Sequence, residues 1–192
     1  MRKSKDAAAA SRKRIVETAS RSLRARGVEG TSVADVMHAA GMTHGGFYKH
    51  FASKDELSDL AARAAFQEIA TRFDVRERDD GQNAARTAYL QDYFSPAHVE
   101  NPEFGCPVAA FGSDAGRNPV ALSPAFAEGA EMLIGRLAGG ESASNRAWAI
   151  RRLATAVGAV VVARAVGKGS LRDEILEACA PEQGPPPPVA DP

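Results

Sequence analysis

The chain has 192 residues, of which 44% are hydrophobic and 25% are charged, as is typical of a soluble globular protein. No run approaches the roughly 20 apolar residues that cross a bilayer, and no apolar segment follows the basic start, so we expect a cytoplasmic protein without a membrane partner. The two cysteines, Cys106 and Cys179, lie far apart in sequence. This spacing predicts neither a disulfide framework nor a metal site, and we expect no cofactor.

The formal net charge is zero, but the charges are unevenly distributed. Residues 1–63 hold 12 lysines and arginines against 7 acidic residues, whereas the remainder holds 12 against 17. A basic N-terminal part favours a polyanionic partner for that part of the chain.

The first helix is predicted from Ser11 to Gly27, after a basic arm over residues 1–10 that we expect to be disordered. Ile15, Ala19 and Leu23 recur at a spacing of four residues, which is typical of one apolar helix face. The arginines of this segment, Arg24 among them, are assigned to the other faces. Gly27 is a typical residue for the end of such a helix.

Two short helices follow. Ser32 and Asp35 have the spacing of a capping box, and the helix that they begin ends at Gly41. A third helix is predicted from His44 to Phe51, and Ser53 with Glu56 repeats the capping pattern before a longer fourth helix. Two short helices joined by a glycine turn are typical of a helix-turn-helix.

Five further helices are predicted, over residues 82–94, 108–115, 119–138, 144–166 and 171–180. An irregular loop is expected from Ser95 to Pro107, and the proline-rich end, residues 184–192, is expected to be disordered. No segment has the pattern of a strand pair. The prediction is an all-α protein, with an N-terminal three-helix domain over residues 11–55 and a C-terminal helical domain over residues 56–183.

The stretch from Arg14 to Leu57, RIVETASRSLRARGVEGTSVADVMHAAGMTHGGFYKHFASKDEL, resembles the DNA-binding domain of the tetracycline-repressor (TetR) family. The resemblance implies a homodimer that binds double-stranded operator DNA and carries a helical effector-binding and dimerisation domain behind the helix-turn-helix. It also implies phosphate contacts from Thr31, Tyr48 and Lys54.

His44 and Lys49 are the candidates for contacts with base edges, and His50 for either bases or backbone. The full set of expected DNA-binding residues is Thr31, Thr43, His44, Gly45, Tyr48, Lys49, His50 and Lys54. Gly45 and Gly46 each cost about 1 kcal/mol of helix propensity relative to alanine. They either permit a close approach to DNA or are simply tolerated.

The aromatic residues of the C-terminal domain fall on helices that surround a ligand pocket in the family. The expected ligand-binding residues are Phe66, Tyr89, Tyr93, Phe94, Cys106, Phe111 and Trp148. Because the sequence has no obvious charge cluster there, we expect a mostly apolar small-molecule effector. For Cys106 two interpretations stay open: a packing or pocket-lining residue, or a sensor of oxidants and electrophiles, as in some members of the family.

The segment from Leu153 to Ala163 is apolar almost all round, so it is either buried within its own domain or shared with a second subunit. With the last helix it resembles the helix pair through which the family dimerises. The expected dimer-interface residues are Leu153, Val157, Val161, Leu171 and Ile175.

These observations predict a dimeric repressor that binds a palindromic operator and is released by a small effector. The alternative is a redox-sensing repressor that acts through Cys106. An enzyme is not expected, because no nucleophile with a base, glycine-rich phosphate loop or metal spacing is present. An interaction module that has lost DNA binding is a further alternative.

Overall fold

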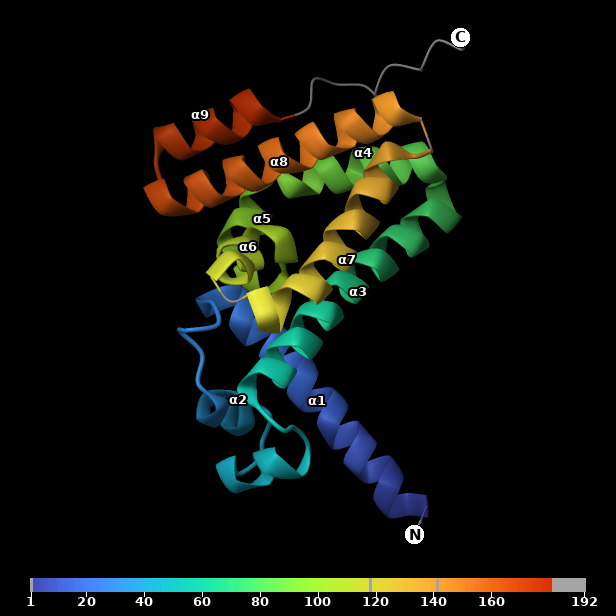
Figure 1. The fold of residues 1–192 in the computed structure, drawn as a ribbon. Helices are drawn as coiled ribbons and strands as arrows, with labels where there is room; N and C mark the ends of the chain where they lie inside the picture. The colour runs from blue at the N-terminus through green and yellow to red at the C-terminus, as the bar shows by residue number, and fades with distance from the viewer. Residues whose placement is uncertain (1, 118, 141, 181–192) are drawn as a thin grey trace.

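The computed structural model describes residues 2–117, 119–140 and 142–180, and no strand occurs within these ranges (Figure 1). The all-α prediction is confirmed. The helices are α1 (Arg2–Arg26), α2 (Val33–Ala39), α3 (Lys54–Asp80), α4 (Gln82–Tyr93), α5 (Pro96–Glu100), α6 (Pro107–Arg117), α7 (Pro119–Ala138), α8 (Ala143–Val166) and α9 (Ser170–Cys179), with the 3₁₀-helices η1 (His44–Lys49) and η2 (Pro102–Phe104).

Helix α1 is longer than the sequence pattern indicated. It begins at Arg2 instead of Ser11, so residues 2–10 are helical where a disordered arm was expected. Alanine has the highest helix propensity, and the run from Ala7 to Ala10 extends the helix without a packing partner. Gly27 ends the helix with a positive φ of 75°, as its position predicted.

The predicted capping box of α2 is present. The Ser32 side chain accepts a hydrogen bond from the Asp35 amide at 3.1 Å, and the Asp35 carboxylate accepts one from the Ser32 amide at 3.3 Å. The Ser32 hydroxyl also donates to the Asp35 carboxylate at 2.7 Å, and this hydrogen bond together with the one from the Ser32 amide lowers the pKa of Asp35. After α2 the chain reverses at Gly41, whose φ of 72° favours glycine, and η1 follows as a 3₁₀-helix.

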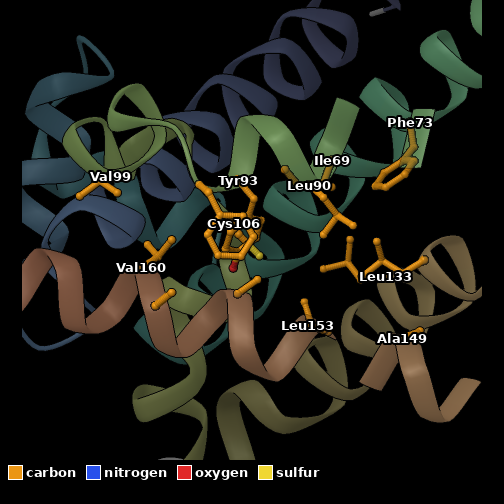
Figure 2. Close-up of a cluster of buried hydrophobic side chains, with 14 of the residues drawn as sticks. Ile69, Phe73, Leu90, Tyr93, Val99, Cys106, Leu133, Ala149, Leu153 and Val160 are labelled. Carbon is orange, nitrogen blue, oxygen red and sulfur yellow. The ribbon is translucent and has the colours of Figure 1, made fainter. Parts of the chain in front are cut away.

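Two apolar clusters form the core, and α3 contributes to both. One cluster joins α1, α2, η1 and the first half of α3, and it includes Ile15, Met37, Phe47 and Leu57. The other joins the second half of α3 to α4, α7, α8 and α9 (Figure 2). Helix α3 therefore links the helix-turn-helix mechanically to the C-terminal helices.

The boundary between the two predicted domains is not a boundary between the two clusters. Phe111 and Ala115 of α6 belong to the cluster of the helix-turn-helix, although they lie far along the chain from it. The segment between α4 and α6, expected as an irregular loop, contains the short helices α5 and η2. The predicted disordered tail, residues 184–192, lies outside the described residues.

The C-terminal helices lie at the end of the molecule opposite the start of α1 (Figure 1). Helix α7 runs beside α3, and α8 and α9 pack against each other at the far end. One face of α8 is buried in its own subunit, through Ala149, Ala156 and Val160 among others. This arrangement leaves the opposite face of α8 at the molecular surface.

Candidate nucleic-acid interface and effector cavity

The element predicted to enter DNA has one buried face and one exposed face. Phe47 is 1% exposed and anchors η1 to the core, with the Phe51 ring 5.5 Å away between centroids. Tyr48 is 73% exposed, although its ring meets that of Phe47 edge to face at 5.2 Å. The remaining predicted contact residues Thr43, His44, Gly45 and Lys49 are exposed, and His50 is half-buried.

Arg12 of α1 fixes the far end of this element. Its guanidinium donates through Nε to the His50 carbonyl oxygen at 3.3 Å and through Nη2 to Glu56 at 2.9 Å. The same guanidinium lies 4.9 Å from the centre of the Phe51 ring. One basic side chain thereby joins α1, the end of η1 and the start of α3.

Helix α3 begins beside the start of α2. The Ser53 hydroxyl accepts a hydrogen bond from the Glu56 amide at 3.1 Å. The Glu56 carboxylate accepts one from the Ala52 amide at 2.6 Å, whereas the capping pattern predicted the Ser53 amide, one residue later, as the donor. Lys54 lines a small cleft together with Ser32. Two helix N-termini and a lysine therefore meet here, which is a favourable arrangement for a phosphate.

Thr31 is placed differently from the prediction. Its side chain is 1% exposed, and its hydroxyl donates to the carbonyl oxygens of Gly27, at 2.9 Å, and Ser22, at 3.3 Å. The side chain ties the end of α1 to the start of α2 instead of facing solvent. The neighbouring Ser32 is exposed and occupies the position that we expected for Thr31.

A cavity of about 370 Å³ opens between α3, α4 and the segment from α5 to Cys106. Of the seven predicted ligand-binding residues, Tyr89, Tyr93 and Cys106 line it. Phe73 and Phe104 also lie in its wall. Figure 2 shows Tyr93 and Cys106 together in the buried cluster, with Leu153 and Val160 of α8 nearby.

The other four predicted ligand-binding residues have packing roles and do not line this cavity. Phe66 packs edge to face against Phe126 at 6.1 Å, and Phe111 is fully buried in the cluster of the helix-turn-helix. Phe94 lies under the guanidinium of Arg152, and Trp148 under that of Arg86. The expectation that these residues lie on helices is confirmed except for Phe94, which directly follows α4, but the sequence did not show which neighbours cover them.

The cavity wall is mostly apolar, but it also contains polar side chains that the sequence analysis did not assign to it. The polar residues in it are Arg72, Arg76, Asp92, Ser95, His98 and Asn101. Ile69, Arg72, Phe73 and Arg76 are spaced at i, i+3, i+4 and i+7 and therefore share one face of α3. That periodicity was present in the sequence and could have identified both arginines as lining residues.

His98 is held as a neutral imidazole at the cavity wall. Its Nδ1 lies 2.7 Å from the Tyr93 carbonyl oxygen, and its Nε2 accepts the Cys106 amide at 2.9 Å. Burial is the main reason that the pKa of His98 falls to about 4, with smaller contributions from Arg164 and Arg72.

The two tyrosines in the wall surround the Cys106 thiol. The Tyr89 hydroxyl lies 3.8 Å from Cys106 Sγ. Burial raises the pKa values of Tyr89 and Tyr93, and proximity to Cys106 raises both further. Both phenols therefore remain protonated near neutral pH and are hydrogen-bond donors.

The predicted dimer residues divide between the inside and the outside of the subunit. Leu153 is 6% exposed and belongs to its own core, which corrects that assignment, and Val157 and Ile175 are partly buried against the same core. Val161 and Leu171 are 45% and 55% exposed. They are accompanied on the surface by Ile150, Ala154, Gly158, Val162, Ala165 and Val166.

Metal and membrane features are not found in the part of the chain that the structure describes. There, no three histidine, cysteine, aspartate or glutamate side chains come together in a way that would hold a metal ion. No helix among the described residues combines the length and the apolar character that a bilayer crossing requires.

Comparison with known proteins identifies the N-terminal part of the chain. Residues 15–61 match the family of bacterial regulatory proteins called the tetR family. The HTH-type transcriptional regulator TtgR of Pseudomonas putida is 42% identical over 57 residues, which are 30% of this chain and 27% of that protein. The probable regulator ArpR of Pseudomonas putida matches to the same extent. The matched region thus spans about a quarter of the length of these relatives.

Solved structures extend the likeness of fold to most of the chain. A TetR transcriptional regulator from Chloroflexus aurantiacus, 23% identical, superposes with a TM-score of 0.73 over 94% of this chain and 95% of that one. The reduced form of Escherichia coli NemR, 18% identical, gives a TM-score of 0.69 over 88% of this chain and 94% of that one. Residues 15–61 therefore form a helix-turn-helix of the tetR family of bacterial regulatory proteins, and the fold of the chain is similar to that of solved TetR regulators.

Proposed function

We propose that this protein is a dimeric transcriptional repressor that binds a palindromic operator and is released by a small effector. The exposed face of η1 carries the proposal, because it presents polar side chains to solvent while its apolar side chains hold it on the core. Tyr48 is the most exposed of the large hydrophobic or aromatic side chains on this face. An exposed aromatic residue with a hydroxyl, on a helix-turn-helix, suits a contact with the DNA backbone.

The proposed DNA contacts are of two kinds: contacts with phosphates, which position the protein, and contacts with base edges, which recognise the sequence. Tyr48, Lys54 and the start of α2 would bind phosphates, with Ser32 taking the role first expected for Thr31. His44 and Lys49 would reach base edges in the major groove, and Thr43, Gly45 and His50 would complete the surface. Phosphate contacts of this kind make the affinity fall steeply with salt concentration.

The exposed apolar face of α8 and α9 supports the dimer. Ile150, Gly158, Val161 and Val162 lie on one side of α8, and Leu171 continues the surface onto α9. Among the described residues, nothing outside the adjacent backbone of α8 would lie within 4 Å of a side-chain carbon at Gly158, so a second helix has room to approach. A two-fold pairing of these helices would form a four-helix bundle and set the distance between the two recognition elements.

Effector binding would reach the DNA-binding helices through the cavity wall. Gly105, directly before Cys106, accepts a hydrogen bond from Arg24 of α1 at 3.2 Å, and α3 supplies both cavity residues and the core of the helix-turn-helix. An effector that fits one arrangement of these helices better than another would shift the population between them. Typical couplings of about 1 to 3 kcal/mol change operator affinity by about one to two decades.

The test is binding of the purified chain to the DNA upstream of its own gene at several salt concentrations. We expect tight, sequence-dependent binding and a steep salt slope, which the double variant Tyr48→Ala plus Lys54→Ala reduces. The matched control, Val75→Ala plus Lys168→Ala, changes an exposed apolar residue and an exposed lysine away from η1. It should leave the operator affinity and the salt slope unchanged. Weak binding that ignores sequence, with the same salt slope in the double variant, would refute the proposal.

A repressor that responds to oxidants through Cys106 is the second candidate. The observation that favours it is the place of Cys106 in the cavity wall, beside the Tyr89 hydroxyl. A protein of similar fold, Escherichia coli NemR, is described in a reduced form. The variant Cys106→Ser decides between the two candidates. Under the second candidate it abolishes release from the operator by oxidant. Under the first candidate it leaves release by the small effector unaffected.

A further inference from the structure

The cavity wall contains a continuous row of rings. The Phe73 and Tyr89 rings lie 4.6 Å apart between centroids, those of Tyr89 and Tyr93 5.7 Å, and those of Tyr93 and His98 4.5 Å. Phe104 lines the same cavity and is half exposed. Offset and edge-to-face contacts with such rings favour a flat aromatic ligand over a branched aliphatic one.

A buried hydroxyl in this wall lacks a strong partner. Tyr93 is 2% exposed, and its hydroxyl lies beside the Cys106 thiol without an oxygen or nitrogen partner among the described residues. A sulfur atom is a weak acceptor, so the phenolic O–H retains a donor for another group. A buried donor without an acceptor is unfavourable, and a ligand oxygen that came within reach of it would remove that cost.

Two arginines add further donors to the wall. Arg72 uses Nη2 for the Phe104 carbonyl oxygen, at 3.1 Å, and for Glu68, at 3.4 Å. Arg76 uses Nη2 for Asp92 at 2.5 Å. Within the described residues, the Nε and Nη1 groups of both arginines have no acceptor, so each guanidinium can still donate to a planar anion.

The charged side chains at the cavity also favour an anionic ligand. Arg72 and Arg76 line the cavity, and Arg24 shares the carboxylate of Glu68 with Arg72. Asp92 pairs with Arg76. Because Arg24 and Glu68 do not line the cavity themselves, its wall carries two guanidiniums against one carboxylate, and His98 is uncharged at neutral pH. The site has an excess of positive charge and of hydrogen-bond donors.

We propose that the cavity binds an aromatic carboxylate, with its ring on the row from Phe73 to Tyr93 and its carboxylate near Arg72 and Arg76. The inference rests on the proposed function, since it names the chemical class of the effector. The volume of about 370 Å³ lies near the lower end of the range for small-molecule pockets and suits one or two fused rings.

The test compares three probes of one shape and different charge by isothermal titration calorimetry on the full chain. The probes are 2-naphthoate, the neutral 2-naphthamide and the cationic 2-naphthylmethylammonium. We expect naphthoate to bind about tenfold more tightly than the amide, as a charge-assisted contact predicts, and the cation to bind least. Equal or tighter binding of the amide, tightest binding of the cation, or no binding of naphthoate would overturn the proposal.

Two variants test whether the preference for naphthoate over the amide arises in this cavity. Tyr93→Phe removes only the hydroxyl, and Arg76→Gln removes one guanidinium and leaves Asp92 to repel an anion. Each should weaken naphthoate binding by about tenfold while the affinity for the amide changes little. Arg146→Gln, which removes an exposed arginine paired with Glu131 on other helices, is the matched control and should change neither affinity. Unchanged naphthoate affinity in both cavity variants would refute the assignment.

Operator binding by the same samples separates this inference from the proposed function. A chain that binds its operator but prefers the amide would refute the carboxylate class and leave the repressor intact. A chain that prefers naphthoate but binds no operator would refute the repressor and leave the ligand class standing.

Discussion

Arg24 and Gly105 are joined by a buried hydrogen bond of 3.2 Å from the guanidinium Nη1 to the carbonyl oxygen. The same guanidinium donates to the Ser20 carbonyl oxygen at 3.3 Å and to Glu68 of α3 at 2.6 Å. Arg24 is 3% exposed, and burial lowers the pKa of its guanidinium, which the contact with Glu68 opposes. One arginine therefore connects α1 to α3 and to the wall of the cavity.

Replacing this arginine is expected to destabilise the fold. Arg24→Gln removes three hydrogen bonds from a buried position and leaves the Gly105 carbonyl oxygen without its partner, so we expect a loss of about 3 kcal/mol. Urea unfolding measures it. Arg63→Gln is the control, because Arg63 joins α3 to Glu128 of α7 at the surface and such pairs contribute under about 1 kcal/mol. Equal losses in both variants would contradict a special role for Arg24.

Gly129 of α7 lies directly against the Phe66 ring of α3. A side-chain carbon at this position would come within 2.2 Å of the Phe66 ring, whereas one at Gly135 of the same helix would meet no described residue outside the adjacent backbone within 4 Å. Gly129→Ala should therefore cost about 1 to 3 kcal/mol despite the better helix propensity of alanine. Gly135→Ala should stabilise by up to about 1 kcal/mol.

Thermal unfolding of both glycine variants measures the difference directly. Lower stability for Gly129→Ala together with higher stability for Gly135→Ala is the expected pair of results. Stabilisation by both substitutions would mean that α3 and α7 do not pack as closely as described.

The helices were predictable because their signals are local. Ser32 with Asp35 marks the start of α2, Gly41 its end, and periodic apolar residues mark the longer helices, so most bounds agree within a few residues. The start of α1 differs because an alanine-rich segment can be helical without an apolar face. In the recognition element, exposure of Tyr48 and burial of Phe47 agree with a helix-turn-helix.

The cavity was less predictable because its lining depends on the orientation of each helix about its axis relative to its neighbours. Arg24 has the sequence character of a surface residue and is buried, whereas Phe111 has the character of a pocket residue and packs in the other core. Leu153 faces its own subunit, and Val161, two turns further, faces outward. Periodicity assigns residues to a face, but only the packed structure shows what covers that face.

His98 makes stability depend on pH above the range in which carboxylates titrate. Its pKa is about 4 in the folded protein, against 6.5 for the ordinary side chain, so the unfolded chain takes up the proton first as the pH falls. Stability is therefore complete above about pH 6.5 and is lost on acidification toward pH 4. Between about pH 7.5 and pH 5 the expected loss from this residue is about 2 kcal/mol.

Urea unfolding at these two pH values, on wild type and on His98→Asn, tests this dependence. The variant should be less stable at neutral pH, because it lacks the paired contacts to the Tyr93 carbonyl and the Cys106 amide. It should also lose less stability on acidification. A variant that retains the full pH dependence would show that another group is responsible.

The outward face of α8 provides the test of assembly. Val161 is 45% exposed and lies beside Gly158 and Val162 on the face that we assign to the partner subunit. Val161→Asp places an unpaired carboxylate in that interface, and burying it should weaken dimerisation by about a hundredfold or more, while a separated subunit keeps the side chain in water.

Sedimentation velocity of wild type, Val161→Asp and Val75→Asp measures the effect. Val75 is a similarly exposed valine on α3, at 42%, and the same substitution there should leave the dimer intact. Unchanged helical content in both variants would show that only assembly has changed, and operator affinity should fall with the dimer, because one subunit presents a single recognition element. A dimer that tolerates Asp at 161 would place the subunit contact elsewhere, and a monomeric wild type would refute the proposed dimer.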